Sequence, residues 1–179
     1  MGRTLKCQLF DTDLGPVFLA WQRNILFCVK YGSGVCDFPQ DVEGHDCEIV
    51  AIASPEMQFA REQLTRYAKG EAASLDDIPV GMRERTEFQA QVLLECRKIA
   101  RGSTVSYGEL AERIGRPRAA RAVGSVMRTN RHPLVIPCHR IVAANGRIGG
   151  YSADDGVRTK ARLLAREGVF QYAAKMGLG

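Results

Sequence analysis

The sequence predicts a mixed α/β (α+β) protein built from two domains. Runs rich in β-branched and aromatic residues, broken by short polar turns, occupy the first 31 residues, whereas helix-start signals recur from residue 54 onward. An irregular connection over residues 70–85 separates the two patterns. We therefore expect a small sheet-plus-helix domain over residues 1–85 and a mainly helical domain with a helix-turn-helix over residues 86–179.

The N-terminal half predicts three strands and one helix. The strands are expected at residues 5–10, 15–21 and 25–31, between short polar turns. Residues 32–48 are rich in Gly and Asp and predict a loop. Ser54 then provides a helix N-cap, followed by proline at the first helical position, and Gly70 ends that helix. Nothing in this half predicts chemistry, so we expect it to support the second domain.

The C-terminal half predicts three successive helices. Capping boxes start the first two, at Thr86-x-x-Gln89 and Ser106-x-x-Glu109. The second helix ends at Gly115, and Pro117 is expected to begin a third helix that ends near Asn130. Two short helices joined by a tight Gly-containing turn are typical of a helix-turn-helix.

Charge is unevenly distributed along the chain. Residues 1–85 carry nine Lys/Arg against thirteen Asp/Glu, and residues 86–179 carry sixteen against seven. Arginine suits bidentate contacts to phosphate. Arg118, Arg121 and Arg128 line one side of the third predicted helix, which favours a recognition helix for DNA. A plain solvated helix face is the alternative.

Residues 135–142 (VIPCHRIV) place a cysteine beside a histidine in an apolar segment. A thiol is a strong nucleophile once its proton is removed, and His139 is the nearest candidate base. A nucleophilic thiol close to a DNA-binding helix indicates chemistry on the nucleic acid itself. A cysteine hydrolase is a poor fit because its histidine lies far along the chain, whereas two of the three histidines here, His132 and His139, lie beside Cys138.

The other cysteines predict reduced thiols. Six cysteines occur without a C-x-x-C pair, and we see neither an export signal nor a membrane-spanning run. We therefore expect a cytoplasmic protein that makes no membrane contact. Cys36, His45 and Cys47 are candidate metal ligands, but their spacing fits no familiar zinc template. We predict no metal and no cofactor.

Residues 136–142 resemble the active-site motif of the O6-alkylguanine-DNA alkyltransferases. Other segments are similar to further motifs of that family, in the same order: 105–111 (VSYGELA), 118–124 (RAARAVG), 127–130 (MRTN), 149–152 (GGYS) and 163–168 (LLAREG). The resemblance is dense over residues 86–169 and loose in the N-terminal half.

The resemblance implies a DNA repair protein that acts once. Such a protein is expected to be a monomer. It binds, through the minor groove, duplex DNA that contains alkylated bases. It flips O6-alkylguanine into a pocket, because a stacked base hides its exocyclic oxygen. The alkyl group then moves irreversibly onto the cysteine. Whether O4-alkylthymine is also a substrate, and which alkyl groups are preferred, stays open.

The resemblance assigns catalytic roles to five residues. Cys138 is the nucleophile, and His139 accepts its proton through a water, since neighbouring side chains in extended backbone point apart. Glu167 orients His139. Tyr107 donates to N3 of the leaving guanine, and Asn130 braces the turn before the active-site segment.

The resemblance also assigns binding residues. The expected pocket residues are Met127, Pro133, Ile141, Tyr151 and Ser152, with backbone groups at Cys138, Ile141 and Ser152 reading the edge of the base. The expected DNA-binding residues are Arg118, Ala120, Arg121, Gly124, Ser125 and Arg128. Arg121 matches the arginine that enters the base stack, with a simple phosphate contact as the alternative.

Two departures from the family pattern stand out. Residues 153–157 (ADDGV) form an apparent two-residue insertion, which brings Asp154 and Asp155 to the expected pocket rim. Gln22 and Phe27 occupy positions where some members hold a structural zinc. Three other classes remain: a damage sensor, which Cys138 argues against, a transcription factor, and a basic domain with an inert thiol.

Overall fold

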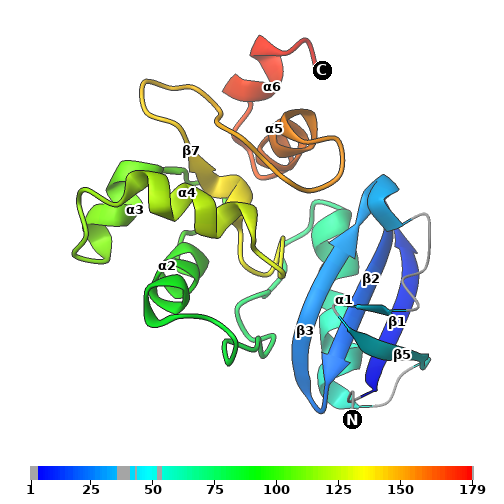
Figure 1. The fold of residues 1–179 in the computed structure, drawn as a ribbon. Coiled ribbons are helices and arrows are strands. Elements are labelled where there is room, and N and C mark those ends of the chain that lie inside the picture. Colours follow the sequence, from blue (N-terminus) through cyan, green and yellow to red (C-terminus); the bar gives the residue numbers. More distant parts are fainter. Residues whose placement is uncertain (1–3, 36–40, 43, 52–53, 179) are drawn as a thin grey trace. The chain divides into compact units, whose positions relative to one another are not determined.

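The computed structural model describes residues 4–35, 41–42, 44–51 and 54–178, and it confirms the mixed α/β class (Figure 1). The chain forms two compact units, Met1–Gly81 and Met82–Gly179. The division falls inside the connection expected over residues 70–85, slightly before the boundary that the sequence suggests.

The described residues of the N-terminal unit form a five-stranded sheet and one α-helix. Its elements are β1 (Leu5–Thr12), β2 (Gly15–Gln22), β3 (Ile25–Tyr31), the 3-10 helix η1 (Gly32–Val35), β4 (Asp41–Val42), β5 (His45–Ile49) and α1 (Pro55–Ala68). The strand order is β3-β2-β1-β5-β4, with β5 parallel to β1 and the other pairs antiparallel. The three predicted strands and the helix are confirmed, and Ser54 caps the helix by accepting from the Met57 N–H.

The prediction of a loop over residues 32–48 is wrong. η1, β4 and the start of β5 lie there among the described residues. β5 lacks the alternating apolar pattern that predicts a strand, because it is mostly exposed. Backbone pairing with β1 holds it in the sheet. Polar sequence at such a strand therefore does not exclude strand structure.

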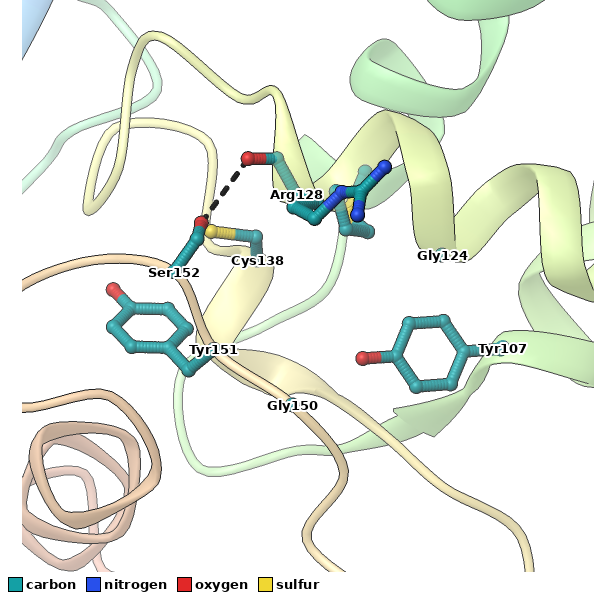
Figure 2. A pocket seen from close by; sticks show the side chains of 8 residues that line it. Tyr107, Gly124, Arg128, Cys138, Gly150, Tyr151 and Ser152 are labelled. Atoms are coloured by element: carbon teal, nitrogen blue, oxygen red, sulfur yellow. Dashed lines mark hydrogen bonds between the residues drawn. The ribbon is translucent and has the colours of Figure 1, made fainter.

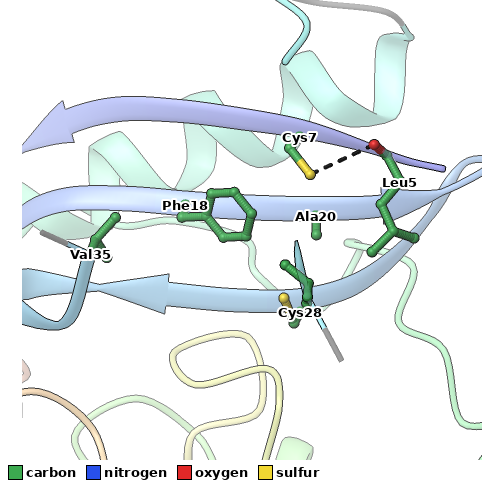
Figure 3. Packing of buried hydrophobic residues seen from close by; sticks show 7 residues of the cluster. Leu5, Cys7, Phe18, Ala20, Cys28 and Val35 are labelled. Carbon is green, nitrogen blue, oxygen red and sulfur yellow. Dashed lines mark hydrogen bonds between the residues drawn. The ribbon is translucent and has the colours of Figure 1, made fainter. Parts of the chain in front are cut away.

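Small apolar side chains and thiols cover one face of this sheet. Cys7 pairs with Ala20, which pairs in turn with Cys28, so the three form a row across β1, β2 and β3. Figure 3 shows this row with Leu5 and Phe18, and all five belong to one buried cluster. The five consecutive buried residues 17–21 of β2 indicate that both faces of the sheet are covered.

The candidate metal site receives no support from the described residues. Cys36 lies outside them, and they contain no group of three His, Cys, Asp or Glu side chains that could hold a metal ion. Cys47 instead packs against the apolar cluster, and His45 lies against the Phe27 ring with centroids 5.1 Å apart.

The C-terminal unit is mainly helical. Its elements are α2 (Glu87–Arg97), β6 (Val105–Ser106), α3 (Tyr107–Arg113), α4 (Ala120–Arg128), the 3-10 helix η2 (Cys138–Arg140), β7 (Ile141–Val142), α5 (Val157–Arg166) and α6 (Gln171–Lys175). Both predicted capping boxes are confirmed. The Thr86 and Ser106 hydroxyls accept from the backbone N–H three positions on, and the side chains of Gln89 and Glu109 accept from the backbone N–H of Thr86 and Ser106. Among the helices described, none is long and apolar enough to cross a membrane.

The third helix begins later than the sequence predicts. Pro117 does not start α4, which begins at Ala120. Instead, the Ala119 N–H donates to the Arg116 carbonyl at 2.8 Å, so Pro117 occupies the second position of a β-turn. The fixed φ of proline suits that turn position as well as the first turn of a helix.

A short parallel pair connects two distant parts of this unit. β6 pairs with β7, with Val105 opposite Ile141 and Ser106 opposite Val142. Since Tyr107 follows β6 directly and Cys138 precedes β7 by one turn of η2, the pairing brings the start of α3 close to the Cys138 segment.

Candidate active site

Cys138 lies in the wall of a cavity of about 260 Å³ in the C-terminal unit. The residues that line it are Tyr107, Gly124, Met127, Arg128, Cys138, Gly150, Tyr151 and Ser152. Figure 2 shows the Cys138 sulfur beside Ser152 and Tyr151, with the Tyr107 hydroxyl directed toward them from the other side. The cavity is slightly smaller than the roughly 300–1,000 Å³ of sites for drug-sized ligands, so it suits a compact ligand.

Asn130 joins the end of α4 to the segment that carries the thiol. Its amide nitrogen donates to the Ile136 carbonyl at 2.9 Å and to Cys138 Sγ at 3.2 Å. Its amide oxygen accepts from the His132 N–H at 3.0 Å. Asn130 therefore braces the turn and also provides a hydrogen-bond donor to the sulfur.

The backbone at Cys138 is not extended. Cys138, His139 and Arg140 form the single turn of η2, which contradicts the extended geometry used to argue for a water between the thiol and His139. Two backbone bonds tighten this turn, from Cys138 N–H to the Ile136 carbonyl and from Arg140 N–H to the Pro137 carbonyl. The periodicity of a short apolar run cannot reveal such a turn, so the sequence alone suggested extended backbone here.

His139, Arg140 and Glu167 form a buried ion network behind Cys138. The Glu167 side chain, at the C-cap of α5, is fully buried and accepts from Arg140 Nε at 2.8 Å and Nη2 at 2.9 Å. His139 Nε2 lies 2.9 Å from Glu167 Oε1, and Arg140 Nη1 also donates to the Ile99 carbonyl at 2.6 Å. Because the carboxylate holds hydrogen on Nε2, Nδ1 is the basic nitrogen of the imidazole.

The groups of this network shift one another's pKa values. Burial raises the pKa of Glu167, but hydrogen bonds from His139 and Arg140 outweigh that and hold the pKa well below its usual range. Burial lowers the pKa of His139, with Glu167 opposing and the charges of Arg140 and Lys160 adding to the decrease. His139 is therefore neutral at pH 7 and able to accept a proton.

The thiol itself is protonated at rest. Burial raises the pKa of Cys138, while hydrogen bonds from Asn130 and Tyr151 and the charge of Lys160 act in the opposite direction. Burial and the neighbouring thiols also raise the pKa of Tyr107. The cavity thus contains a thiol that needs a base and a phenol that keeps its proton.

The backbone loop before Tyr151 fixes the Tyr107 ring. Gly149 has φ +74°, and a Cβ built there would lie 3.2 Å from Tyr107 Cε2 and 3.2 Å from the Ala143 nitrogen. Only glycine combines this φ with so close an approach. The ring of Tyr107 therefore packs directly on the loop that lines the cavity.

The predicted pocket residues are only partly in the cavity. Met127, Tyr151 and Ser152 line it, whereas Pro133 and Ile141 do not. Both are buried, and the Ile141 carbonyl accepts from Lys160 Nζ. Apolar character at Pro133 and Ile141 therefore reflects packing behind the wall.

Several residues at the site were not predicted from the sequence to lie there. Gly124 and Arg128 line the cavity although they were expected only to bind DNA, and Gly150 was assigned no role. Lys160 and the Arg140–Glu167 pair were not expected, because a charged residue on a helix is ordinarily solvent-exposed. Lys160 lies next to Ala161 and four residues before Leu164, on the apolar face of α5. That position is the one sequence signal that could have indicated its burial.

The exposed side of α4 carries the predicted DNA-binding residues. Arg121, Ser125 and Arg128 are exposed at spacings of four and three, which places them on one helix face. The opposite face buries Val123, Val126 and Met127. Arg118 is also exposed, but it belongs to the turn before α4, while Ala120 and Gly124 are half-buried.

The inserted acidic residues do not line the cavity. Asp154 accepts from Thr159 Oγ1 at 2.9 Å, and the Asp155 N–H donates to the same oxygen at 3.2 Å. Asp155 also lies 3.5 Å from Arg158 Nε. The insertion is thus bonded to the first turn of α5, directly after the Tyr151–Ser152 wall.

Comparisons with known proteins point to one family. Residues 87–169 match the model of the 6-O-methylguanine DNA methyltransferase DNA-binding domain. A methylated-DNA–protein-cysteine methyltransferase of Methanosarcina acetivorans is 35% identical over 163 residues, which cover 89% of this chain and 96% of the relative. The enzyme of the same name from Rattus norvegicus is 33% identical, covering 98% of this chain and 88% of the relative.

Solved structures agree with these relatives. A crystal structure of Mycobacterium tuberculosis OGT in complex with DNA is 32% identical, with a TM-score of 0.73, and the match covers 90% of this chain and 92% of that one. A crystal structure of the Mycobacterium tuberculosis O6-methylguanine methyltransferase gives a TM-score of 0.73 at 31% identity. With the thiol, the cavity and the arginine-bearing helix in one unit, this chain belongs to the 6-O-methylguanine DNA methyltransferase family.

Proposed function

We propose that this protein repairs DNA by moving the alkyl group of O6-alkylguanine irreversibly onto Cys138. The observation that carries the proposal is the Cys138 sulfur in the wall of a base-sized cavity, behind which His139 and Glu167 form a hydrogen-bonded pair. The relatives named above are methylated-DNA–protein-cysteine methyltransferases, and DNA is the partner in the similar mycobacterial structure.

The first chemical step removes the thiol proton. His139 accepts it at Nδ1, while the Glu167 carboxylate stabilises the imidazolium that forms. Asn130 and Tyr151 then donate hydrogen bonds to the thiolate. This arrangement follows the pattern of a nucleophile, a base and a group that orients the base.

The second step is a direct displacement at the alkyl carbon. A carbon–sulfur bond forms as the bond from that carbon to guanine O6 breaks, and the electron pair of that bond goes to the guanine. Tyr107, which lines the cavity, donates its proton to N3 of the base and so stabilises the leaving group. The product is a thioether, which water does not cleave under ordinary conditions, so one protein repairs one lesion.

Binding of duplex DNA is assigned to the exposed face of α4. Arg118, Ser125 and Arg128 supply phosphate contacts, with Ala120 and Gly124 allowing close approach to the minor groove. Arg121 occupies the place that the flipped base leaves. The protein is proposed to act as a monomer, because transfer needs only one thiol and one cavity.

Intact-protein mass spectrometry after incubation with a duplex that contains one O6-methylguanine tests the proposal. We expect a gain of one methylene unit that saturates at one per protein and maps to Cys138. The unmodified duplex and the Cys138→Ser variant are the controls, and neither should change the mass. If the protein binds the lesion but its mass does not change, the proposal is wrong and the protein is a damage sensor.

A further inference from the structure

A second cavity, of about 500 Å³, lies in the C-terminal unit between α6 and the loop that follows β7 (Figure 1). The loop contributes residues 143 and 146–149 to its lining, and the last turns of α6 contribute three more. The floor is apolar, because Tyr172 is buried there and Ile148 packs against the same cluster. Two exposed cations, Arg147 and Lys175, stand at the rim. We call this cavity the loop–α6 groove.

The two cations of the groove are not neutralised by the protein. No acidic side chain lines the groove, and neither Arg147 nor Lys175 forms a salt bridge with a carboxylate of the described residues. Two unpaired cations at the rim of one groove attract an anion. Since the floor is apolar, the ligand that fits best combines an anion with an apolar body. A DNA phosphate with its deoxyribose has this character.

The loop holds Arg147 in a defined place. Asn145 and Gly146 have φ angles of +60° and +69°, which reverse the chain within two residues. The Ala143 N–H donates to the Arg147 carbonyl at 2.9 Å and closes the reversal. Because the backbone at Arg147 is already fixed, ordering it costs little when a ligand binds.

The groove adjoins the cavity that contains Cys138. Gly149 lines the groove, and the next residue, Gly150, lines the Cys138 cavity. Gly124 of α4 and Gly149 of the loop both lie against the Tyr107 ring, so the surface runs without a break from α4 to the loop. A DNA strand that places a base in the Cys138 cavity has to cross the rim of that cavity. Its neighbouring phosphates then lie close to the loop.

We propose that the loop–α6 groove is a further DNA-binding site, which holds the backbone of the lesion-bearing strand beside the flipped nucleotide, with Arg147 and Lys175 each contacting a phosphate. This inference rests on the proposed function. It extends the DNA contact beyond α4 to residues that have no other partner to bind.

The salt dependence of DNA binding tests the two phosphate contacts. The Cys138→Ser protein, which should bind without transferring, serves as the parent, and fluorescence anisotropy measures its affinity for a duplex with one O6-methylguanine. Each lost phosphate contact makes the slope of log affinity against log salt shallower by about 0.9. The double variant Arg147→Gln/Lys175→Gln should therefore have a slope shallower by about 1.8, and its affinity at 0.1 M salt should fall roughly tenfold or more.

Arg162→Gln is the matched control. Arg162 is an exposed cation of the same unit that lines neither cavity, so its loss should leave affinity and slope close to those of the parent. Unchanged affinity and slope in the folded double variant overturn the proposal. If that variant binds DNA like the parent but sediments differently, the groove holds the acidic N-terminal half of a second copy, and the proposal is wrong.

Methylphosphonate substitution locates the contacts on the DNA. Each modified duplex carries one uncharged linkage, placed at successive positions on both sides of the lesion. We expect one or two positions close to the lesion at which the uncharged linkage weakens binding of the parent but not of the double variant. If every linkage weakens binding of both proteins equally, the two cations do not contact phosphate and the proposal fails.

The results also separate this inference from the proposed function. If the double variant loses affinity and slope as expected, but the protein with Cys138 intact never gains a methyl group from DNA, the repair function fails and the DNA-binding groove stands. If methyl transfer occurs and DNA binding does not depend on Arg147 and Lys175, the inference alone fails.

Discussion

The protein contains two groups of buried thiols that differ in their surroundings. On the N-terminal sheet, Cys7 has Cys47 and Cys28 as neighbours, and burial together with those thiols raises its pKa far above the usual value. In the C-terminal unit, burial also raises the pKa of Cys138, but hydrogen bonds and the charge of Lys160 act against it. Burial alone makes a thiol inert, and a nucleophile additionally needs donors, a cation and a base.

The largest expected difference between the two thiols is in alkyl transfer itself. Cys138→Ser should abolish methyl transfer from O6-methylguanine DNA, because an alcohol is a far weaker nucleophile at pH 7. Cys7→Ala should transfer at the rate of the unsubstituted protein. Tritium transfer from a labelled duplex measures both. Loss of transfer in a folded Cys7→Ala protein would show that the comparison is wrong.

Next in size is the cost of breaking the ion network behind Cys138. Arg140→Met leaves the fully buried Glu167 carboxylate without its bidentate partner, so the free energy of unfolding should fall by about 3–5 kcal/mol. Arg131→Met removes a more exposed ion pair with Glu84 and should cost at most about 1 kcal/mol. Urea denaturation of both variants gives the values, and similar costs would contradict the assignment of a buried network.

The hydrogen bond from Asn130 to the sulfur should have an intermediate effect. Asn130→Ala removes a donor to a charged acceptor, a contribution of about 1.5–3 kcal/mol, so transfer at pH 7 should slow roughly 10–100-fold. The midpoint pH for alkylation of Cys138 by iodoacetamide should rise as well, which a simple loss of the turn brace would not produce. Asn24→Ala, on an exposed turn of the sheet, is the control for loss of an asparagine.

The smallest expected effect concerns the packing of Tyr107. Gly149→Ala should lower stability and transfer, because its Cβ would meet the Tyr107 ring and the Ala143 nitrogen at 3.2 Å. Gly115→Ala is the matched control, since it has a similar φ of +70° and open space around the added Cβ. Both substitutions carry the roughly 1 kcal/mol cost of positive φ, and only Gly149→Ala should affect transfer. Equal transfer rates in Gly149→Ala and Gly115→Ala would show that the packing of Gly149 on the Tyr107 ring does not matter for transfer.

Local signals account for the parts of the fold that the sequence predicted correctly. The strands of β1 to β3 follow from β-rich runs between polar turns, and the starts of α2 and α3 follow from capping boxes at Thr86 and Ser106. Each signal lies within a few consecutive residues. β5 and the true start of α4 were mispredicted because strand pairing with β1 and a turn at Pro117 decided them.

By itself the sequence predicted the family, a candidate nucleophile and the arginine-rich helix, because residue types at short spacing carry that information. Only the tertiary structure decided which polar side chains are buried together. Arg140 reaches the Ile99 carbonyl and the Glu167 carboxylate, and Lys160 reaches Ile141 and Gly150, through contacts between separate segments of the chain. Such burial is stable only when several elements supply partners at once, so no local pattern can predict it.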